Sequence, residues 1–109
     1  MDRKDLIDYL NNKLDINLLL HQIKPELEKY KSGLKKIGGS APIILDGDKG
    51  SVNITRIHLE KLKQDLSNNI IDCFFVSYVS DALFLSENSM FESDEIKDDF
   101  ELLTEYPFN

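Results

Sequence analysis

The chain has 109 residues, which is enough for one domain of ordinary size and too few for two. Its 20 acidic and 13 basic residues leave a net charge of −7, which argues against a basic surface that grips nucleic acid. No apolar run approaches the ~18 residues that cross a bilayer, and the N-terminal residues are polar, unlike an export signal. The lone Cys73 has no disulfide partner within the chain. We therefore expect a cytoplasmic protein without direct nucleic-acid or membrane binding.

Two helices are predicted in the first third of the chain. Residues 4–13 have a short helical pattern, for which Asp2 or Asp5 is a suitable N-cap. Residues 16–37 have the clearest amphipathic pattern, with Asp15 as its N-cap. The apolar positions are Leu6, Tyr9 and Leu10 in the first helix and Ile16, Leu19, Ile23, Leu27, Tyr30, Leu34 and Ile37 in the second.

The longer helix contains Pro25, which lacks the backbone donor that a helix interior needs. We therefore expect a kink at Pro25, or a break with a restart in which Pro25 occupies the first turn. After this helix the pattern changes to two short β-prone runs, 42–46 and 51–54, which are separated by a glycine-rich turn. A small β-hairpin near residues 42–54 is the simplest interpretation.

The second half of the chain predicts further helices. Residues 55–68 follow the N-cap candidate Thr55, and their apolar stripe consists of Ile57, Leu59, Leu62 and Leu66. Residues 70–85 are apolar around most of a helical circumference, which predicts the most buried helix, although the β-branched and aromatic content leaves a strand over 70–79 as an alternative. Residues 86–90 are expected to form a loop.

The last helix begins at Ser93, or after the capping-box spacing of Ser89 and Glu92, and its inward face consists of Ile96, Phe100 and Leu103. These patterns together predict one domain over residues 1–109. Its fold class is mostly α, as a small α+β domain of about four to five helices with the short hairpin.

Groups that could support catalysis or bind a metal are sparse. His21 and His58 are each isolated on a predicted helix, and we expect each to be a surface or partly packed residue. Cys73 lies among apolar neighbours, which predicts a buried and inert thiol. The segment Asp46–Gly50 lacks the ligand spacing of a calcium loop. We expect no enzyme activity, no metal and no cofactor.

The charge of the chain is segregated along its length. Residues 1–40 carry a net charge of +2, residues 41–70 a net charge of zero, and residues 71–109 a net charge of −9 with Lys97 as their one basic residue. A surface of a single sign attracts cationic partners and speeds encounter with them, although such a surface can also serve only to keep a protein in solution. The residues that we expect to contact a partner are Glu92, Asp94, Glu95, Asp98, Asp99, Glu101 and Tyr106. Phe108 is a second aromatic candidate, with packing of the C-terminal residues onto the core as the alternative.

Several stretches of the second half resemble small bacterial immunity proteins that accompany polymorphic toxins, including those of contact-dependent growth inhibition. The stretches are Val52-Asn53-Ile54-Thr55, His58-Leu59, the run from Tyr78 to Ser86, the run from Phe91 to Ile96 and the run from Leu102 to Asn109. The resemblance implies a cytoplasmic protein that binds and neutralises a cognate toxin domain, often a nuclease, without a cofactor.

Three other functions fit the same sequence. An acidic nucleic-acid mimic from a phage or mobile element would use the same charge against a host DNA-binding protein. A small helical adaptor subunit would present the apolar stripe of residues 16–37 to a partner helix. An enzyme would have to be centred on Cys73.

Overall fold

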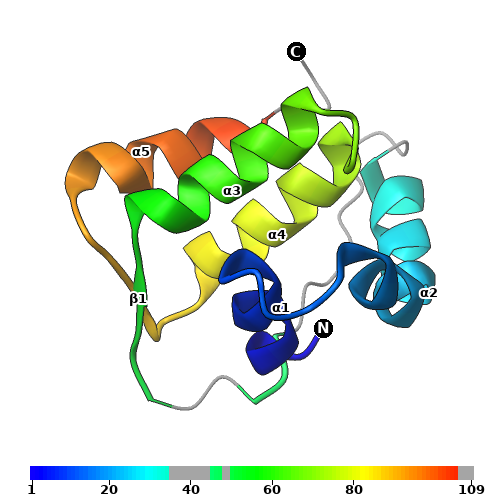
Figure 1. Ribbon diagram of the computed structural model, residues 1–109, viewed down its shortest axis with the longest axis horizontal. Coiled ribbons are helices and arrows are strands. Elements are labelled where there is room, and N and C mark those ends of the chain that lie inside the picture. Colours follow the sequence, from blue (N-terminus) through cyan, green and yellow to red (C-terminus); the bar gives the residue numbers. More distant parts are fainter. Residues whose placement is uncertain (35–44, 48–49, 106–109) are drawn as a thin grey trace.

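The computed structural model of the chain describes residues 1–34, 45–47 and 50–105. Within these ranges the expected mostly helical class is confirmed, with five helices and two short strands (Figure 1). In chain order the elements are α1 (Arg3–Leu10), α2 (Ile16–Leu34), β1 (Val52–Ile54), α3 (Arg56–Ser67), α4 (Cys73–Leu85), β2 (Ser89–Phe91) and α5 (Asp94–Leu103).

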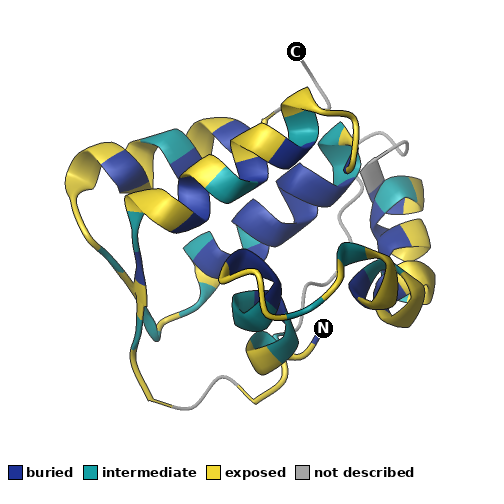
Figure 2. Ribbon diagram, in the orientation of Figure 1, coloured by how far each residue is buried: buried dark blue, intermediate teal, exposed yellow. Residues whose placement is uncertain are grey.

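Helix α4 is the centre of the core, and α2, α3 and α5 all pack against it (Figures 1 and 2). Eight of its side chains are buried, because an element that is apolar around its circumference is stable only when neighbours cover it on several sides. The Oδ1 atom of Asp72 accepts a hydrogen bond from the backbone N of Phe75 at 2.8 Å, which caps the first turn. Residues 73–79 are therefore helical, and the alternative of a strand over 70–79 is wrong.

The two N-terminal helices begin at caps that the sequence predicts. Asp2 accepts from the backbone N of Lys4 at 2.8 Å, and Asp15 accepts from the backbone N of Asn17 at the same distance. Helix α2 continues through Pro25 without the break that was one of the two expectations. The later part of the predicted 16–37 segment, after Leu34, lies outside the described residues.

The apolar stripe of α2 is turned into the core rather than toward solvent. The residues Leu19, Ile23, Leu27 and Tyr30 are all buried (Figure 2). They pack in one cluster with the apolar residues of α1, α3, α4 and α5. This stripe therefore stabilises the domain, as expected for an amphipathic helix in a globular protein.

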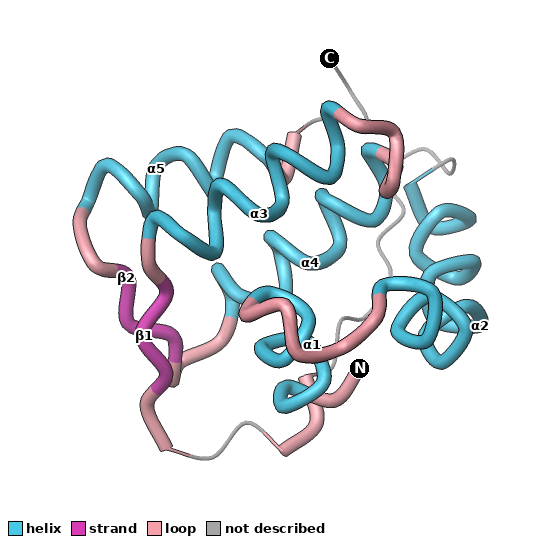
Figure 3. Tube along the Cα trace, viewed as in Figure 1, coloured by secondary structure: helices cyan, strands magenta, loops and turns pink. Residues whose placement is uncertain are grey.

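The sheet differs from the predicted hairpin. The strand predicted at 51–54 is present as β1, but its partner is β2, and the two strands run parallel with Val52 opposite Ser89 and Ile54 opposite Phe91 (Figure 3). Residues 42–44 and 48–49 of the expected hairpin lie outside the described residues, while Asp46 forms an isolated parallel bridge with Asp2. The expected loop at 86–90 is also wrong in its last two residues, because Ser89 and Met90 belong to β2.

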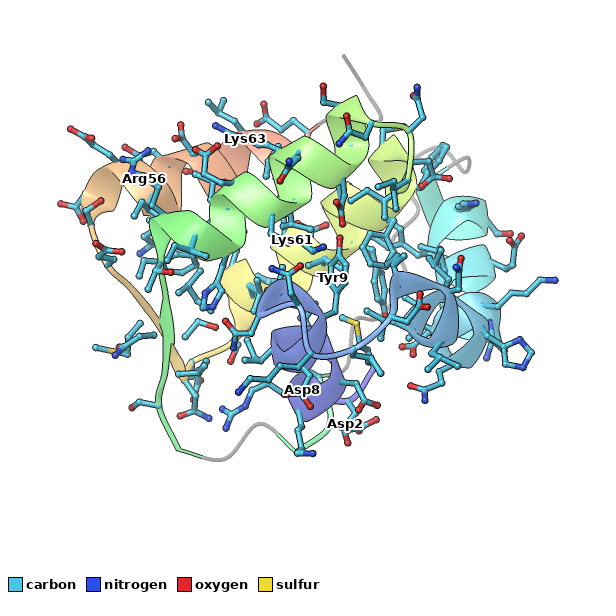
Figure 4. All side chains as sticks on the ribbon, viewed as in Figure 1. Asp2, Asp8, Tyr9, Arg56, Lys61 and Lys63 are labelled. Atoms are coloured by element: carbon cyan, nitrogen blue, oxygen red, sulfur yellow. The ribbon has the colours of Figure 1, made fainter. Side chains whose placement is uncertain are left out.

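A buried polar contact joins α1 to α3. The hydroxyl of Tyr9 donates to Oδ2 of Asp65 at 2.6 Å, and Nζ of Lys61 lies 3.2 Å from the same oxygen. The ammonium of Lys61 also lies 5.1 Å from the centre of the Tyr9 ring (Figure 4). The charge of Asp65 is therefore matched where it is buried, which removes most of the cost of placing a carboxylate there.

Candidate partner-binding surface

Helix α5 has one apolar face and one acidic face. Ser93 caps it, since its Oγ accepts from the backbone N of Ile96 at 3.3 Å. The predicted inward residues Ile96, Phe100 and Leu103 are all buried against α3 and α4, which confirms the expected face of this helix. The opposite face follows from the helical repeat. We call its three exposed carboxylates, Asp94, Asp98 and Glu101, the acidic stripe.

The acidic stripe is not neutralised by the rest of the described chain. None of its three carboxylates lies within 4.0 Å of a cationic group of the described residues. They follow one another at i,i+4 and i,i+3 spacing, where like charges repel by a few tenths of a kcal/mol per pair. The stripe therefore carries a concentrated negative charge in a geometry that slightly destabilises its own helix.

The other predicted contact residues on this side lie at the border with α3. Oε2 of Glu92 accepts from the backbone N of Arg56 at 3.3 Å, and the guanidinium of Arg56 lies 4.0 Å from Glu95. Further along, Nζ of Lys63 lies 3.8 Å from Asp99. Figure 4 shows Arg56 and Lys63 on the side of α3 that faces α5. The predicted contact residues therefore form two groups. The carboxylates of the acidic stripe have no cationic partner among the described residues, whereas the flanking carboxylates contact Arg56 or Lys63 of α3.

The single basic residue of α5 does not screen the stripe. Lys97 lies one residue before Asp98, but its Nζ sits over the ring of Phe84 on α4, 5.7 Å from the ring centre. A lysine in this position gains a cation–π contact and directs its charge toward α4. The charged groups on the side of α5 between Lys97 and the α3 border are therefore the carboxylates of the acidic stripe.

An exposed apolar residue borders the stripe. Leu102, one residue after Glu101, is 59% exposed, as are several other single apolar residues of the described chain. Together with the carboxylates it has the mixed composition of an interface rim. The two aromatic residues expected to assist, Tyr106 and Phe108, lie outside the described residues.

Sequence reasoning missed the two basic residues of α3 that hold the flank. Helical periodicity places Arg56 and Lys63 on one polar face of α3, seven residues apart, and this spacing was the available signal. Ile57 is a correction on the same helix. It was expected in the apolar stripe, but it is 71% exposed, because the stripe turns inward only from His58 onward.

Cys73 also differs from expectation. It is half-buried rather than buried, because it is the first residue of α4 and only one side of the helix start is covered. It borders a groove of about 480 Å³ that is lined mainly by apolar residues of α2 and of the α3–α4 connection. Among the described lining residues the one carboxylate is that of Asp72, which caps α4 and lies 3.6 Å from Nζ of Lys31.

His58 is buried and has a defined hydrogen-bonding role. Its Nδ1 atom accepts from the backbone N of Thr55 at 3.2 Å, and its Nε2 atom lies 2.9 Å from Oδ1 of Asn11. Burial lowers the pKa of this imidazole. His21, in contrast, is exposed on α2.

No group of three or more His, Cys, Asp or Glu side chains in ranges 1–34, 45–47 and 50–105 is arranged to hold a metal ion. Within those same ranges, no helix combines the length and the hydropathy that a bilayer crossing requires.

Comparison of the chain with protein-family models, with curated proteins and with solved structures found no match. A functional conclusion must therefore come from the residues and their geometry.

Proposed function

We propose that this chain is an immunity protein that binds a cognate toxin domain stoichiometrically through the acidic stripe and its flank, with a nuclease as the toxin that fits best. The observation that carries the proposal is the unneutralised stripe of Asp94, Asp98 and Glu101 on a helix whose flanking carboxylates are already engaged. A nuclease must present a basic surface to the phosphates of its substrate, and carboxylates seated there exclude that substrate.

The energetics favour a protein partner over a purely solubilising role. Carboxylates at i,i+3 and i,i+4 spacing cost the isolated chain stability, whereas close charge pairs across a protein interface contribute about 1.5–7 kcal/mol of coupling when water is excluded. The exposed side chain of Leu102 adds apolar area at the edge of the same surface. The stripe therefore has the composition of a surface whose repulsion is relieved by a basic partner.

A charge-removal variant tests the proposal. The proposal predicts that an adjoining gene encodes the toxin domain, and the experiment measures association of the chain with that domain and survival of bacteria that express both. We expect D94N/D98N/E101Q to associate about tenfold more slowly at low salt, with a flatter dependence on salt, because electrostatic steering accelerates association by about 10–10³-fold. We also expect it to protect cells less well.

The matched control is D5N/D8N/E28Q, which changes the net charge by the same amount on α1 and α2. Asp8 and Glu28 form ion pairs with Lys4 and Lys31 at the surface of the protein. Surface ion pairs contribute little to stability, so the loss of these two should cost little. We expect this control to bind and protect like the wild type. Equal slowing by both variants would attribute the effect to net charge, and wild-type rates for both would remove the stripe from the interface.

The same stripe favours one other function, which is a nucleic-acid mimic that blocks a host DNA-binding protein. This alternative predicts that the chain releases a DNA-binding protein of the host from its DNA. It also predicts no protection against the adjoining toxin. The two functions therefore separate in one set of binding and survival assays.

A further inference from the structure

The first turn of α3 is held by a histidine in a position where capping boxes normally use glutamate or glutamine. Thr55 is the N-cap residue and His58 is the third residue of the helix, and Nδ1 of His58 accepts from the backbone N of Thr55 at 3.2 Å. A backbone N–H can only donate, so Nδ1 must be an unprotonated acceptor. This contact exists only with the neutral imidazole.

The other ring nitrogen ties the same turn to a second part of the chain. Nε2 of His58 lies 2.9 Å from Oδ1 of Asn11, the residue that ends α1. With Nδ1 as the acceptor, Nε2 carries the ring proton and donates it to the amide oxygen. One neutral imidazole therefore joins the start of α3 to the end of α1.

We infer that His58 is an acid-sensitive latch, which in its neutral form closes the first turn of α3 through the capping contact with Thr55 and opens that turn when it is protonated. Protonation turns Nδ1 into a donor that faces the donating N–H of Thr55, so the capping contact is lost. The Asn11 contact survives, because Nε2 remains a donor. This inference concerns the fold and does not depend on whether the acidic stripe binds a toxin.

The latched turn positions part of the candidate surface. The backbone N of Arg56, the first residue of α3, donates to Glu92, and the Arg56 guanidinium pairs with Glu95. Loosening the first turn of α3 therefore loosens the contacts that hold the start of α5. The acidic stripe itself has no contact with His58 among the described residues.

The charged groups around the latch act in both directions. From the β2–α5 side, the carboxylates of Glu92 and Glu95 favour a protonated His58, while Arg56 and Lys61 on α3 itself disfavour one. On α1, Asp8 pairs with Lys4 at 3.7 Å, and on α4 the one charged residue, Asp81, is bonded to Tyr30. Among the described residues no carboxylate forms an ion pair with the imidazole within 4.0 Å, and burial is the influence that lowers its pKa.

The direction of the pH effect follows from that shift. A histidine whose pKa is lower in the folded chain than in the unfolded chain contributes stability above its unfolded pKa of about 6.5, and this stability is lost as the pH falls through the folded value. The loss should have the size of a broken helix cap, which corresponds to a fall of about threefold to thirtyfold in the folding equilibrium constant.

The test compares the full-length wild type with H58Q and H21Q by urea denaturation at about pH 7.5 and about pH 5.5. Glutamine at position 58 is the usual capping-box residue and does not titrate, so we expect H58Q to keep its stability over this range. Exposed His21 provides the matched control, and H21Q should lose stability on acidification as the wild type does. The protection factor of the Thr55 amide in hydrogen exchange, which compares its rate with that of an unstructured chain at the same pH, should fall at the lower pH in the wild type and not in H58Q.

Two results would overturn the inference. One is an equal loss of stability in the wild type and H58Q on acidification. The other is an NMR titration of the His58 ring in the wild type with a midpoint at or above the ordinary value for histidine, and this second measurement needs no variant to fold. A low midpoint in the wild type together with a flat H58Q profile supports the latch.

Discussion

At the scale of single residues, a row of hydroxyl and carboxyl groups crosses the core beside α4. The hydroxyl of Tyr30 lies 2.8 Å from Oδ2 of Asp81 and 2.6 Å from Oγ of Ser77, and Ser77 donates to the carbonyl oxygen of Thr104 at 2.8 Å. Tyr30 donates to Asp81 and Ser77 donates to Thr104, so both hydroxyl protons are used and the Asp81 carboxyl accepts. Burial raises the pKa of this carboxyl, against a smaller lowering by the hydrogen bond from Tyr30.

This row predicts a pH dependence opposite in sign to that of His58. A carboxyl whose pKa is higher in the folded chain contributes stability at low pH, and this stability is lost as the pH rises through the folded value. We expect D81N, which has a similar shape and does not titrate, to lack this loss in urea denaturation between about pH 4 and about pH 8. D81A should be less stable by about 1–3 kcal/mol, because Tyr30 is left with one contact fewer in the core. A wild-type pH profile in D81N would contradict the assignment of this pH dependence to Asp81.

At the scale of elements, α5 combines a well-packed inner face with an outer face that repels itself. Asp98 stands at the centre of that face, four residues after Asp94 and three before Glu101. The Ser93 cap and the buried Ile96, Phe100 and Leu103 keep the helix formed despite this repulsion. Residues that lower stability without a structural benefit are typical of binding surfaces.

Replacing Asp98 alone should therefore separate stability from binding. We expect D98N to raise the free energy of unfolding by about 0.6–1.5 kcal/mol, because it removes three like-charge pairs, with Asp94, Glu95 and Glu101, and asparagine has a similar helix propensity. If the proposed function holds, the same variant should bind the toxin domain more weakly. Chemical denaturation and binding kinetics on one preparation check both effects, and a D98N chain that loses stability would show that the stripe does not repel itself.

The sequence was sufficient for the five helices and most of their buried faces, since four of them carry an apolar period that the core uses and α4 is apolar around its circumference, although Ile57 on α3 was misplaced. Two kinds of contact were not predictable in this way. The pairing of β1 with β2 is non-local, and strands of three residues carry too little alternating pattern to identify a partner. The contacts of Arg56 and Lys63 with α5 depend on how α3 and α5 lie against each other, which the periodicity of neither helix specifies.

At the scale of the whole molecule, charge acts over distances comparable with the domain. The described chain extends 34 × 30 × 29 Å, and the Debye length is about 30 Å at 0.01 M salt and about 8 Å at 0.15 M. At low salt each carboxylate of the acidic third therefore repels carboxylates across the entire domain. At physiological salt only neighbours on the same helix or the next one interact.

This comparison predicts that added salt stabilises the chain. We expect the thermal midpoint to rise when sodium chloride is increased from about 0.01 M to about 0.15 M, since screening weakens the self-repulsion of a chain with net charge −7. The rise should be smaller for D94N/D98N/E101Q. Circular dichroism melts at several salt concentrations provide the measurement, and a midpoint that falls with salt would mean that attractive ion pairs such as Lys63–Asp99 dominate instead.

The parallel pairing of β1 and β2 also has a consequence for the order of folding. Val52 meets Ser89 only after the intervening 36 residues, which hold α3 and α4, have folded back on themselves, so the entropy of closing a long loop must be overcome before any bond of the ladder forms. A ribbon of three residues cannot supply that free energy alone. Helices α3 and α4 must therefore pack together first. Pairing of β1 with β2 then follows as a late step that depends on this packing.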